Sequence, residues 1–322
     1  MGIAARGPMK KLSIVIPTRN RQDVLSKALQ AYLNQKTLEG LLEIIVVDDH
    51  SSDGTEAIVA DFRQRSPIPI RYACAQHRGA AAARNEGIRQ SKGELILFTD
   101  DDIIPSSDLI AEHISFHSRY PQRELAVLGY VAWSPEVRPT PFMRWLGEEG
   151  ALFHFRGLKR EQELAFDHFY TCNVSLKLEF LRANGLFDEE FEAAGWEDTE
   201  LGYRLSKSGL RLLYNPSALA YHYRHLSFAD AMRRARDFAG PQRIFETKEA
   251  GVRLREITRR SIDSPGPRQE KLLVKILAPL LKPLLDTQVR LPSIVYAHLY
   301  QYYARKVSND MAVPARVAKL DS

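Results

Sequence analysis

Short apolar runs alternate with amphipathic stretches over the first hundred residues. The apolar runs are rich in β-branched residues and are bounded by proline, glycine or acidic residues, which predicts buried strands. Between them, apolar residues recur at helical spacing. The predicted strands cover residues 12–17, 42–48, 70–73 and 95–99, and the helices cover 23–35, a segment ending at 65, and 80–91. This order predicts a doubly wound α/β sheet.

The pattern is less regular over the next hundred residues. We expect an irregular, aromatic and charged loop over 134–168 that contains a short helix near 141–149. The other predicted elements are a helix from 107 to 120, strands over 125–133, 169–176 and 210–223, and helices over 178–184 and 197–209.

Polar residues stand where the predicted strands end. Thr18 follows the first strand, Asp48 and Asp49 end the second, and Asp100, Asp101 and Asp102 follow the strand over 95–99. Ligands of such sheets lie at the carboxyl ends of the strands, so these side chains should share one edge. Grouped carboxylates repel each other, and hard divalent cations take carboxylate oxygens. A metal site is therefore predicted, with a solvated acidic turn as the alternative.

An acidic pair with a preceding tryptophan leads into the predicted helix that ends at 209. Glu197 and Asp198 lie at or just before its first turn, where the helix dipole favours ionised carboxylates. Ordinary N-terminal acids of a helix would look the same. Near the last predicted strand, His222 suits either a structural role or a site. The chain has no glycine-rich GxGxxG or GK[ST] loop after a strand, which disfavours a dinucleotide site or a P-loop.

The charge of the chain indicates which classes of partner it can bind. The 322 residues contain 45 Lys and Arg against 40 Asp and Glu, and 224–275 is rich in basic residues. This suits phosphate-bearing ligands or an anionic membrane, and no motif for nucleic acid is present. The two cysteines form no zinc pattern, and no signal peptide or apolar run of membrane-spanning length occurs. A cytoplasmic protein is expected, with attachment to the inner face of the membrane left open.

Six motifs together resemble one family, the inverting GT-A glycosyltransferases of the bacterial family 2 group. The segment over 172–205 is also similar to the acceptor-side segment of the β-1,4-galactosyltransferases. The matching stretches are IVIPTRNR at 14–21, VVDDHSSDGT at 46–55, RGAAAARNEGI at 78–88, LILFTDDDIIP at 95–105, CNVSLKLEFLRANGLFDEEF at 172–191 and WEDTELGYRL at 196–205. The resemblance implies a GT-A fold, Rossmann-like, with a mixed, mostly parallel sheet flanked by helices and followed here by a C-terminal helical extension.

The resemblance also implies roles for residues. Asp198, with Glu197 beside it, corresponds to the catalytic base, and Asp102 and His222 to ligands of Mn²⁺ or Mg²⁺. Trp133 and Trp196 are assigned to the acceptor. The positions assigned to the nucleoside-diphosphate sugar donor are Pro17, Thr18, Arg19, Asn20, Asp48, Asp49, Arg78, Gly79, Arg84, Asp100 and Asp101.

The predicted reaction moves a sugar from the donor, with UDP favoured as its nucleotide, to a hydroxyl of a glycan or lipid-linked acceptor in cell-surface polysaccharide synthesis. A metal neutralises the diphosphate leaving group, and a carboxylate removes the acceptor proton. Three alternatives stay open. They are a retaining mechanism, a nucleotidyltransferase and a non-catalytic module that binds nucleotide sugars.

The expected organisation has three parts. Residues 1–11 form a flexible N-terminus, and 12–225 form the catalytic domain, divided into a donor half over 12–105 and an acceptor half over 106–225. Residues 226–322 form a basic helical extension with a break at 264–267. Its apolar and basic residues suit either a membrane surface or packing on the catalytic domain or in a homodimer.

Overall fold

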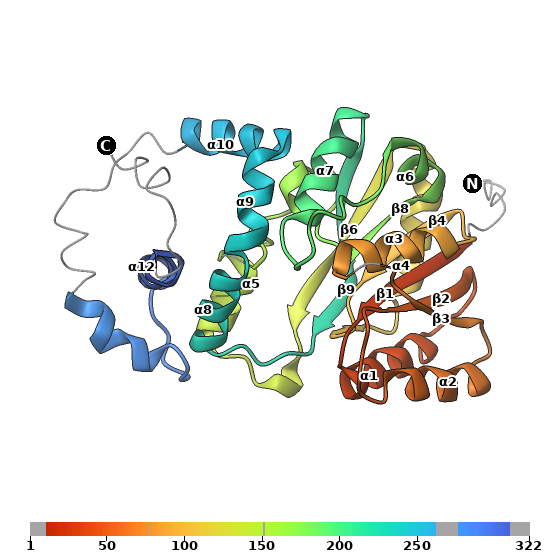
Figure 1. The fold of residues 1–322 in the computed structure, drawn as a ribbon, viewed down its shortest axis with the longest axis horizontal. Coiled ribbons are helices and arrows are strands. Elements are labelled where there is room, and N and C mark those ends of the chain that lie inside the picture. Colours follow the sequence, from red (N-terminus) through yellow and green to blue (C-terminus); the bar gives the residue numbers. More distant parts are fainter. Residues whose placement is uncertain (1–10, 77, 151, 262–275, 310–322) are drawn as a thin grey trace, which may run out of the picture. The chain divides into compact units, whose positions relative to one another are not determined.

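The computed structural model describes residues 11–76, 78–150, 152–261 and 276–309 (Figure 1). By its internal contacts the chain divides into two compact units. One contains the residues up to Ser134 together with Gly157–Tyr223, and the other contains Pro135–Arg156 and the residues from Arg224 onward.

The first unit is built on a mixed sheet. Its first four strands are parallel neighbours in the order β3-β2-β1-β4. Nearly all of their β-branched and leucine side chains are buried, as the largely apolar runs predict, and Leu42 is half-buried. The strands are β1 Leu12–Thr18, β2 Leu41–Asp48, β3 Ile70–Cys74 and β4 Leu95–Thr99.

The sheet continues beyond β4 with a change of direction. β8 (Asn173–Lys177) runs antiparallel to both β4 and β6 (Leu125–Trp133), and β6 is parallel to β9 (Arg211–His222). Two short strands, β5 (Ile103–Pro105) and β7 (Glu163–Leu164), pair antiparallel with β9. The predicted fold class is therefore confirmed, although β5 and β7 were not predicted.

The strand expected from residue 169 starts four residues later. Phe166–His168 form a 3₁₀ turn, η2, and the amides of Phe169 and Asn173 donate to Phe166 and Tyr170 carbonyls respectively. These turn bonds use the backbone groups that a ladder would need, so β8 begins only at Asn173.

Helices flank this sheet. α3 packs against β1 and β2, and a Cβ at Gly87 would lie 2.3 Å from Cγ1 of Val15. The small residues of α3 therefore allow close contact with the sheet and fix where α3 begins, next to the strand ends. The helices are α1 Gln22–Leu33, α2 Thr55–Arg65, α3 Ala80–Gln90, α4 Leu109–Arg119, α6 Leu178–Asn184 and α7 Glu197–Lys207.

The second unit is helical and has an aromatic core. The Phe142 ring packs 5.4 Å from that of Phe228 and 6.0 Å from that of Tyr296, measured between centroids. Residues 276–281 are also helical. The other elements are the 3₁₀ turns η1 Pro135–Val137 and η3 Lys282–Leu284, and the helices α5 Pro141–Glu148, α8 Phe228–Asp237, α9 Ala239–Thr247, α10 Glu249–Ser261 and α12 Ser293–Asn309.

The basic extension thus begins as three helices, with a Ser227–Asp230 capping box at the start of α8. The break predicted at 264–267 lies outside the described residues. Within the described part of the chain, no helix is long and apolar enough to cross a membrane.

Candidate active site

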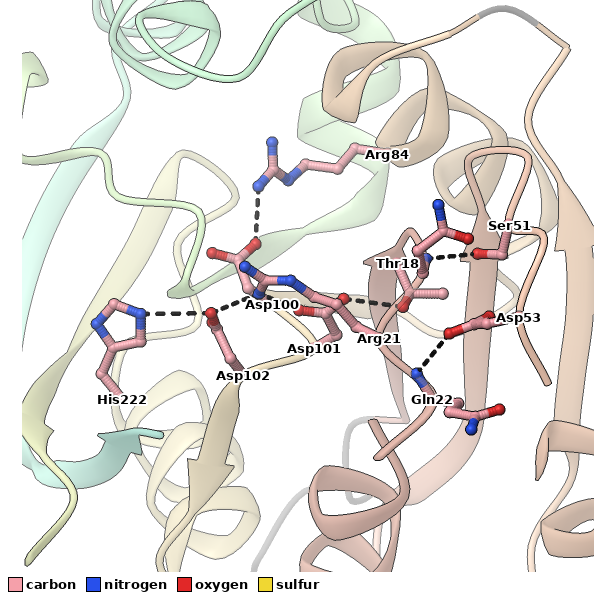
Figure 2. A network of polar contacts seen from close by, with 11 residues as sticks. Thr18, Arg21, Gln22, Ser51, Asp53, Arg84, Asp100, Asp101, Asp102 and His222 are labelled. Carbon is pink, nitrogen blue, oxygen red and sulfur yellow. Dashed lines mark hydrogen bonds and ion pairs between the residues drawn. The ribbon is translucent and has the colours of Figure 1, made fainter. Parts of the chain in front are cut away.

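The ends of β1 and β4 bring the three aspartates beside Thr18. These two strands are parallel neighbours, so Thr18 and the Asp100–Asp102 turn meet at one edge of the sheet. The Thr18 hydroxyl donates to Oδ2 of Asp101 at 2.8 Å (Figure 2). The shared edge predicted from the sequence is present.

An arginine neutralises two of the aspartates. Nη1 of Arg21 donates to Oδ1 of Asp101 at 2.9 Å and to Oδ2 of Asp102 at 2.6 Å (Figure 2). On the other side, Nε2 of His222 lies 3.5 Å from the same Oδ2 of Asp102. Arg21 had no predicted role, although it ends the motif at 14–21 and three carboxylates in one turn require a nearby cation.

The two carboxylates bound by Arg21 differ in acidity. Burial raises the pKa of Asp101 to about 6, and Arg21 opposes this shift. Burial acts in the same direction on Asp102, but His222 and Arg21 together hold the pKa of Asp102 well below its usual range. Asp102 therefore stays ionised at neutral pH and is the stronger candidate to hold a cation.

Trp133 lies against the predicted metal ligand. Its ring stacks on the His222 ring with centroids 4.9 Å apart and an interplanar angle of 17°. The two residues are paired in the β6–β9 register, and the Ser134 amide donates to the His222 carbonyl. The structure therefore fixes the plane of the His222 ring and places Trp133 next to the aspartates.

Arg84 connects the three aspartates with the acidic pair of α7. Its side chain is only 5% exposed, and Nη2 donates to Oδ1 of Asp100 at 2.9 Å. Nη1 donates to Oε1 of Glu197 at 2.8 Å, and Oε2 of Glu197 accepts from the Gly195 amide at 2.6 Å. One buried guanidinium thus joins two carboxylates that lie on different elements (Figure 2 shows the Asp100 side).

Asp198 has the electrostatics of a proton acceptor. Burial and the neighbouring charge of Glu197 raise the pKa of Asp198 to about 7, while Arg84 opposes the rise. Part of its surface stays accessible, and Oδ1 accepts from the Thr199 amide at 2.7 Å. The preceding Trp196 has a left-handed backbone with φ 72°, unusual for so bulky a residue. A carboxyl that titrates near neutrality suits general-base chemistry.

The two aspartates at the end of β2 differ in their hydrogen bonds: both side-chain oxygens of Asp48 have a partner, and one oxygen of Asp49 has none among the described residues. Asp48 accepts from the Ser51 amide and hydroxyl, at 2.9 and 2.5 Å, and from the Tyr72 hydroxyl at 2.5 Å. Asp49 accepts at Oδ2 from Arg19 at 3.4 Å, and its buried Oδ1 has no hydrogen-bond partner among the described residues. Asp49 is therefore better placed than Asp48 to accept from a ligand.

Asn20 and Pro17 shape the same edge. Asn20 has a positive φ of 52°, its amide donates to the Ser51 hydroxyl at 2.8 Å, and its Oδ1 accepts from the Ser52 amide at 2.7 Å. Pro17 lies within β1 and pairs with Val47 of β2. The hydrogen bonds of Asn20 therefore hold the loops after β1 and β2 together.

The start of α3 meets the loop before α7. Gly79 has φ 106°, and a Cβ there would lie 2.4 Å from the Glu192 carbonyl oxygen. Asn85 donates to the Phe187 carbonyl and accepts from the Phe187 amide, both at 2.9 Å. Arg78 is exposed. Asn85, which had no predicted role, therefore helps hold the segment that leads to Glu197.

Comparison with known proteins agrees with this geometry. The model of glycosyl transferase family 2 matches residues 13–177, which is half of the chain and contains the aspartates and Thr18. The chain belongs to this family. The match ends before α7, so the resemblance of 178–205 to an acceptor-side segment stays a prediction.

Curated relatives of this family 2 chain are glycosyltransferases. The GalNAc(5)-diNAcBac-PP-undecaprenol beta-1,3-glucosyltransferase of Campylobacter jejuni is 42% identical over 198 residues, 58% of this chain and 59% of the relative. The validoxylamine A glucosyltransferase of Streptomyces hygroscopicus subsp. limoneus is 31% identical over 223 residues, 62% and 48% of the two chains. An uncharacterized glycosyltransferase of Bacillus subtilis is 27% identical over 261 residues, 67% and 66%. The chain thus spans about half to two thirds of these relatives.

Solved structures share the fold. A mannosyltransferase from Pyrobaculum calidifontis, in complex with GDP-Man and Mn²⁺, has a TM-score of 0.55 at 19% identity and covers 97% of this chain and 76% of its own. TarS 1-349 of S. aureus, in complex with UDP, has a TM-score of 0.55 at 18% identity, and the match covers 94% of this chain and 91% of the TarS chain. At these identities the likeness shows the GT-A fold alone, which confirms the predicted fold.

Proposed function

We propose that this chain is a metal-dependent inverting glycosyltransferase that uses a nucleoside-diphosphate sugar, with a UDP-sugar as the first candidate. The observation that carries the proposal is the pair of clusters at one sheet edge. One contains the ionised Asp102, and the other contains Asp198, whose pKa is raised to about 7. Donor binding and proton removal need these two different kinds of carboxylate.

Family membership implies a divalent metal, and the residues present fit one. Asp102 and His222 offer an oxygen and a nitrogen ligand 3.5 Å apart. The described residues contain no group of three or more His, Cys, Asp and Glu that could hold a metal, which suits an ion completed by substrate phosphates and water. When bound, Mn²⁺ or Mg²⁺ would stabilise the charge that develops on the diphosphate leaving group.

The chain's own residues supply the remaining chemistry. Asp198 takes the proton of the acceptor hydroxyl as its oxygen attacks the anomeric carbon. The bond from that carbon to the terminal phosphate oxygen breaks, and the nucleoside diphosphate leaves. Asp49, through its buried Oδ1, accepts from the nucleoside, and Thr18 orients Asp101. In-line displacement with a single base inverts the anomeric configuration.

For the acceptor we propose a hydroxyl of a glycan or of a lipid-linked glycan, in cell-surface polysaccharide synthesis. The Campylobacter relative's name includes a PP-undecaprenol acceptor, and other relatives are named hyaluronan synthase and chondroitin synthase. Trp196 and Trp133 are the proposed acceptor contacts. Trp196 directly precedes the pair Glu197 and Asp198 in the sequence, and Trp133 stacks on His222, which approaches Asp102.

The C-terminal unit suits attachment to an anionic membrane near such an acceptor. Residues 224–322 contain 19 Lys and Arg against 10 Asp and Glu, whereas 1–223 contain 26 against 30. Its exposed apolar side chains include Ile276, Leu280 and Ile294. Co-sedimentation with anionic and with neutral vesicles tests this attachment, and sedimentation velocity tests the competing homodimer. Binding to neither vesicle would rule out the membrane role.

The test of the function is a donor screen. Melting temperatures in Mn²⁺ with UDP-, GDP- and dTDP-sugars should show stabilisation by one nucleotide class, and slow hydrolysis of that donor should follow. NMR of the product should then show the inverted anomer. Stabilisation without hydrolysis or transfer would favour a non-catalytic module, and a retained anomer would contradict the mechanism.

A further inference from the structure

We propose that Arg21 occupies the cation position of Asp101 and Asp102 in the free protein and exchanges with the metal. In this scheme the divalent ion displaces Arg21 from Asp102, and the released guanidinium binds the donor diphosphate. The inference rests on the proposed use of a metal and a nucleoside diphosphate. It assigns to Arg21 a role that couples the two ligands.

The contacts of Asp102 make an exchange necessary. Its side chain is 8% exposed, and Oδ2 carries both the 2.6 Å bond from Arg21 and the 3.5 Å approach of His222. A divalent ion held by Asp102 and His222 needs this oxygen. It would also stand beside the guanidinium, and like charges at such distances repel strongly. Binding of the metal therefore has to break the Arg21–Asp102 pair.

Arg21 is free to move where the other arginine of the site is not. Its side chain is 34% exposed, and the hydrogen bonds observed for its guanidinium go to Asp101 and Asp102. Arg84 is 5% exposed and is held at both ends by Asp100 and Glu197. Because Arg21 precedes α1, its swing need not disturb a helix or a strand.

A displaced Arg21 remains next to the position that the diphosphate must occupy. A guanidinium binds phosphate oxygens through parallel N–H donors and is suited to this task. The negative charge of the diphosphate would then neutralise the Arg21 guanidinium that the metal displaced from Asp102. By linkage, each ligand must raise the affinity for the other, so the metal alone should bind weakly.

The experiment measures Mn²⁺ binding directly, by electron paramagnetic resonance of free Mn²⁺, on the full chain with and without UDP (GDP if UDP does not bind). The variants are Arg21→Gln and Arg21→Lys. Arg65→Gln is the matched control, because Arg65 forms an exposed ion pair with Asp61. Melting curves verify that each variant is folded. If Arg21→Gln does not fold, Arg21→Lys is used for the test instead.

Without nucleotide, Arg21→Gln should bind Mn²⁺ about tenfold more tightly than the unaltered chain, as expected for removing a charged hydrogen-bond partner. With Mn²⁺ saturating, it should bind the nucleotide about tenfold more weakly. Arg21→Lys should change both affinities in the same directions but less, and Arg65→Gln should change neither.

Two results overturn the inference while leaving the proposed function intact. They are unchanged or weaker Mn²⁺ binding by the nucleotide-free Arg21 variants, and unchanged nucleotide affinity in Mn²⁺. If the unaltered chain binds nucleotide equally with and without Mn²⁺, the metal dependence itself fails, and the inference fails with it.

Discussion

The acidic cluster around Asp102 and the one around Asp198 contain similar residues, but the pKa of Asp102 is lowered and that of Asp198 is raised. Each contains adjacent carboxylates and one arginine. Arg21 binds Asp101 and Asp102, whereas Arg84 joins Glu197 to Asp100. Around Asp102, a partly exposed Arg21 and His222 keep the carboxylate ionised. Around Asp198, the buried Arg84 is already committed to Asp100 and Glu197, and the pKa of Asp198 is raised to about 7.

The difference shows that the partners of an acidic pair, rather than the acids themselves, decide its chemistry. A carboxylate with an arginine and a histidine within reach, such as Asp102, serves to hold positive charge. A carboxylate whose arginine is shared with other acids keeps a high affinity for a proton. The same residue type can thus bind the donor at one cluster and remove a proton at the other.

The largest effect is expected from the base. Asp198→Asn should lower transfer by about a thousandfold, because the acceptor hydroxyl loses its proton acceptor. Its affinity for Mn²⁺ and nucleotide should stay within about twofold. Initial rates and calorimetry measure the two properties. Glu179→Gln is a matched control, since Glu179 is an exposed acid in the first turn of α6. Full activity in Asp198→Asn would show that the α7 acids only cap a helix.

A smaller loss is expected at the donor cluster. Asp102→Asn should weaken binding of nucleotide in Mn²⁺ by about 10- to 100-fold. It should not weaken the metal-free binding, because the substitution also releases Arg21 for the diphosphate. Calorimetry in Mn²⁺ and in EDTA gives both values. Asp108→Asn is the control, because Asp108 lies on the surface paired with Lys36. Equal losses with and without metal would mean that Asp102 supports the fold instead.

The smallest effect concerns stability. Because the folded state raises the pKa of Asp198 from 3.8 to about 7, the loss of stability caused by this group grows from about pH 4 and is fully present above about pH 7. At pH 8, Asp198→Asn should therefore be more stable by about 1 to 2 kcal/mol, a few degrees in melting temperature. Near pH 3, where Asp198 is protonated in both states, the difference should vanish. A less stable variant at pH 8 would contradict the raised pKa.

Strand periodicity and the residues at strand ends predicted most of this arrangement. The runs that became β1, β2 and β4 are largely apolar, and their order along the chain placed Thr18 and Asp100–Asp102 at one edge. The short strands β5 and β7 were missed because two or three residues carry no periodicity.

The missed contacts join residues far apart in the sequence. Arg21 reaches Asp102 across 81 positions, and Arg84 reaches Glu197 across 113. Spacing arguments see local patterns only, so they gave the acids. The family resemblance assigned Arg84 to the donor but did not predict its bond to Glu197, and Arg21 had no predicted role. Likewise, Asp48 and Asp49 look equivalent in the sequence, and their hydrogen bonds in the fold distinguish them: Asp48 accepts from Ser51 and Tyr72, whereas Oδ1 of Asp49 has no partner among the described residues.

The pH dependence of kcat, measured at saturating donor and Mn²⁺, tests the division of roles most directly. Saturation keeps donor binding, and the Asp101 pKa of about 6, out of the profile. We predict that log kcat falls with unit slope as the pH drops below about 7. In Arg84→Gln the pH at which this fall begins should be higher by about one pH unit, because a cation near Asp198 is lost. A flat profile from pH 5 to 9, or a limb that Arg84→Gln leaves in place, would contradict the account.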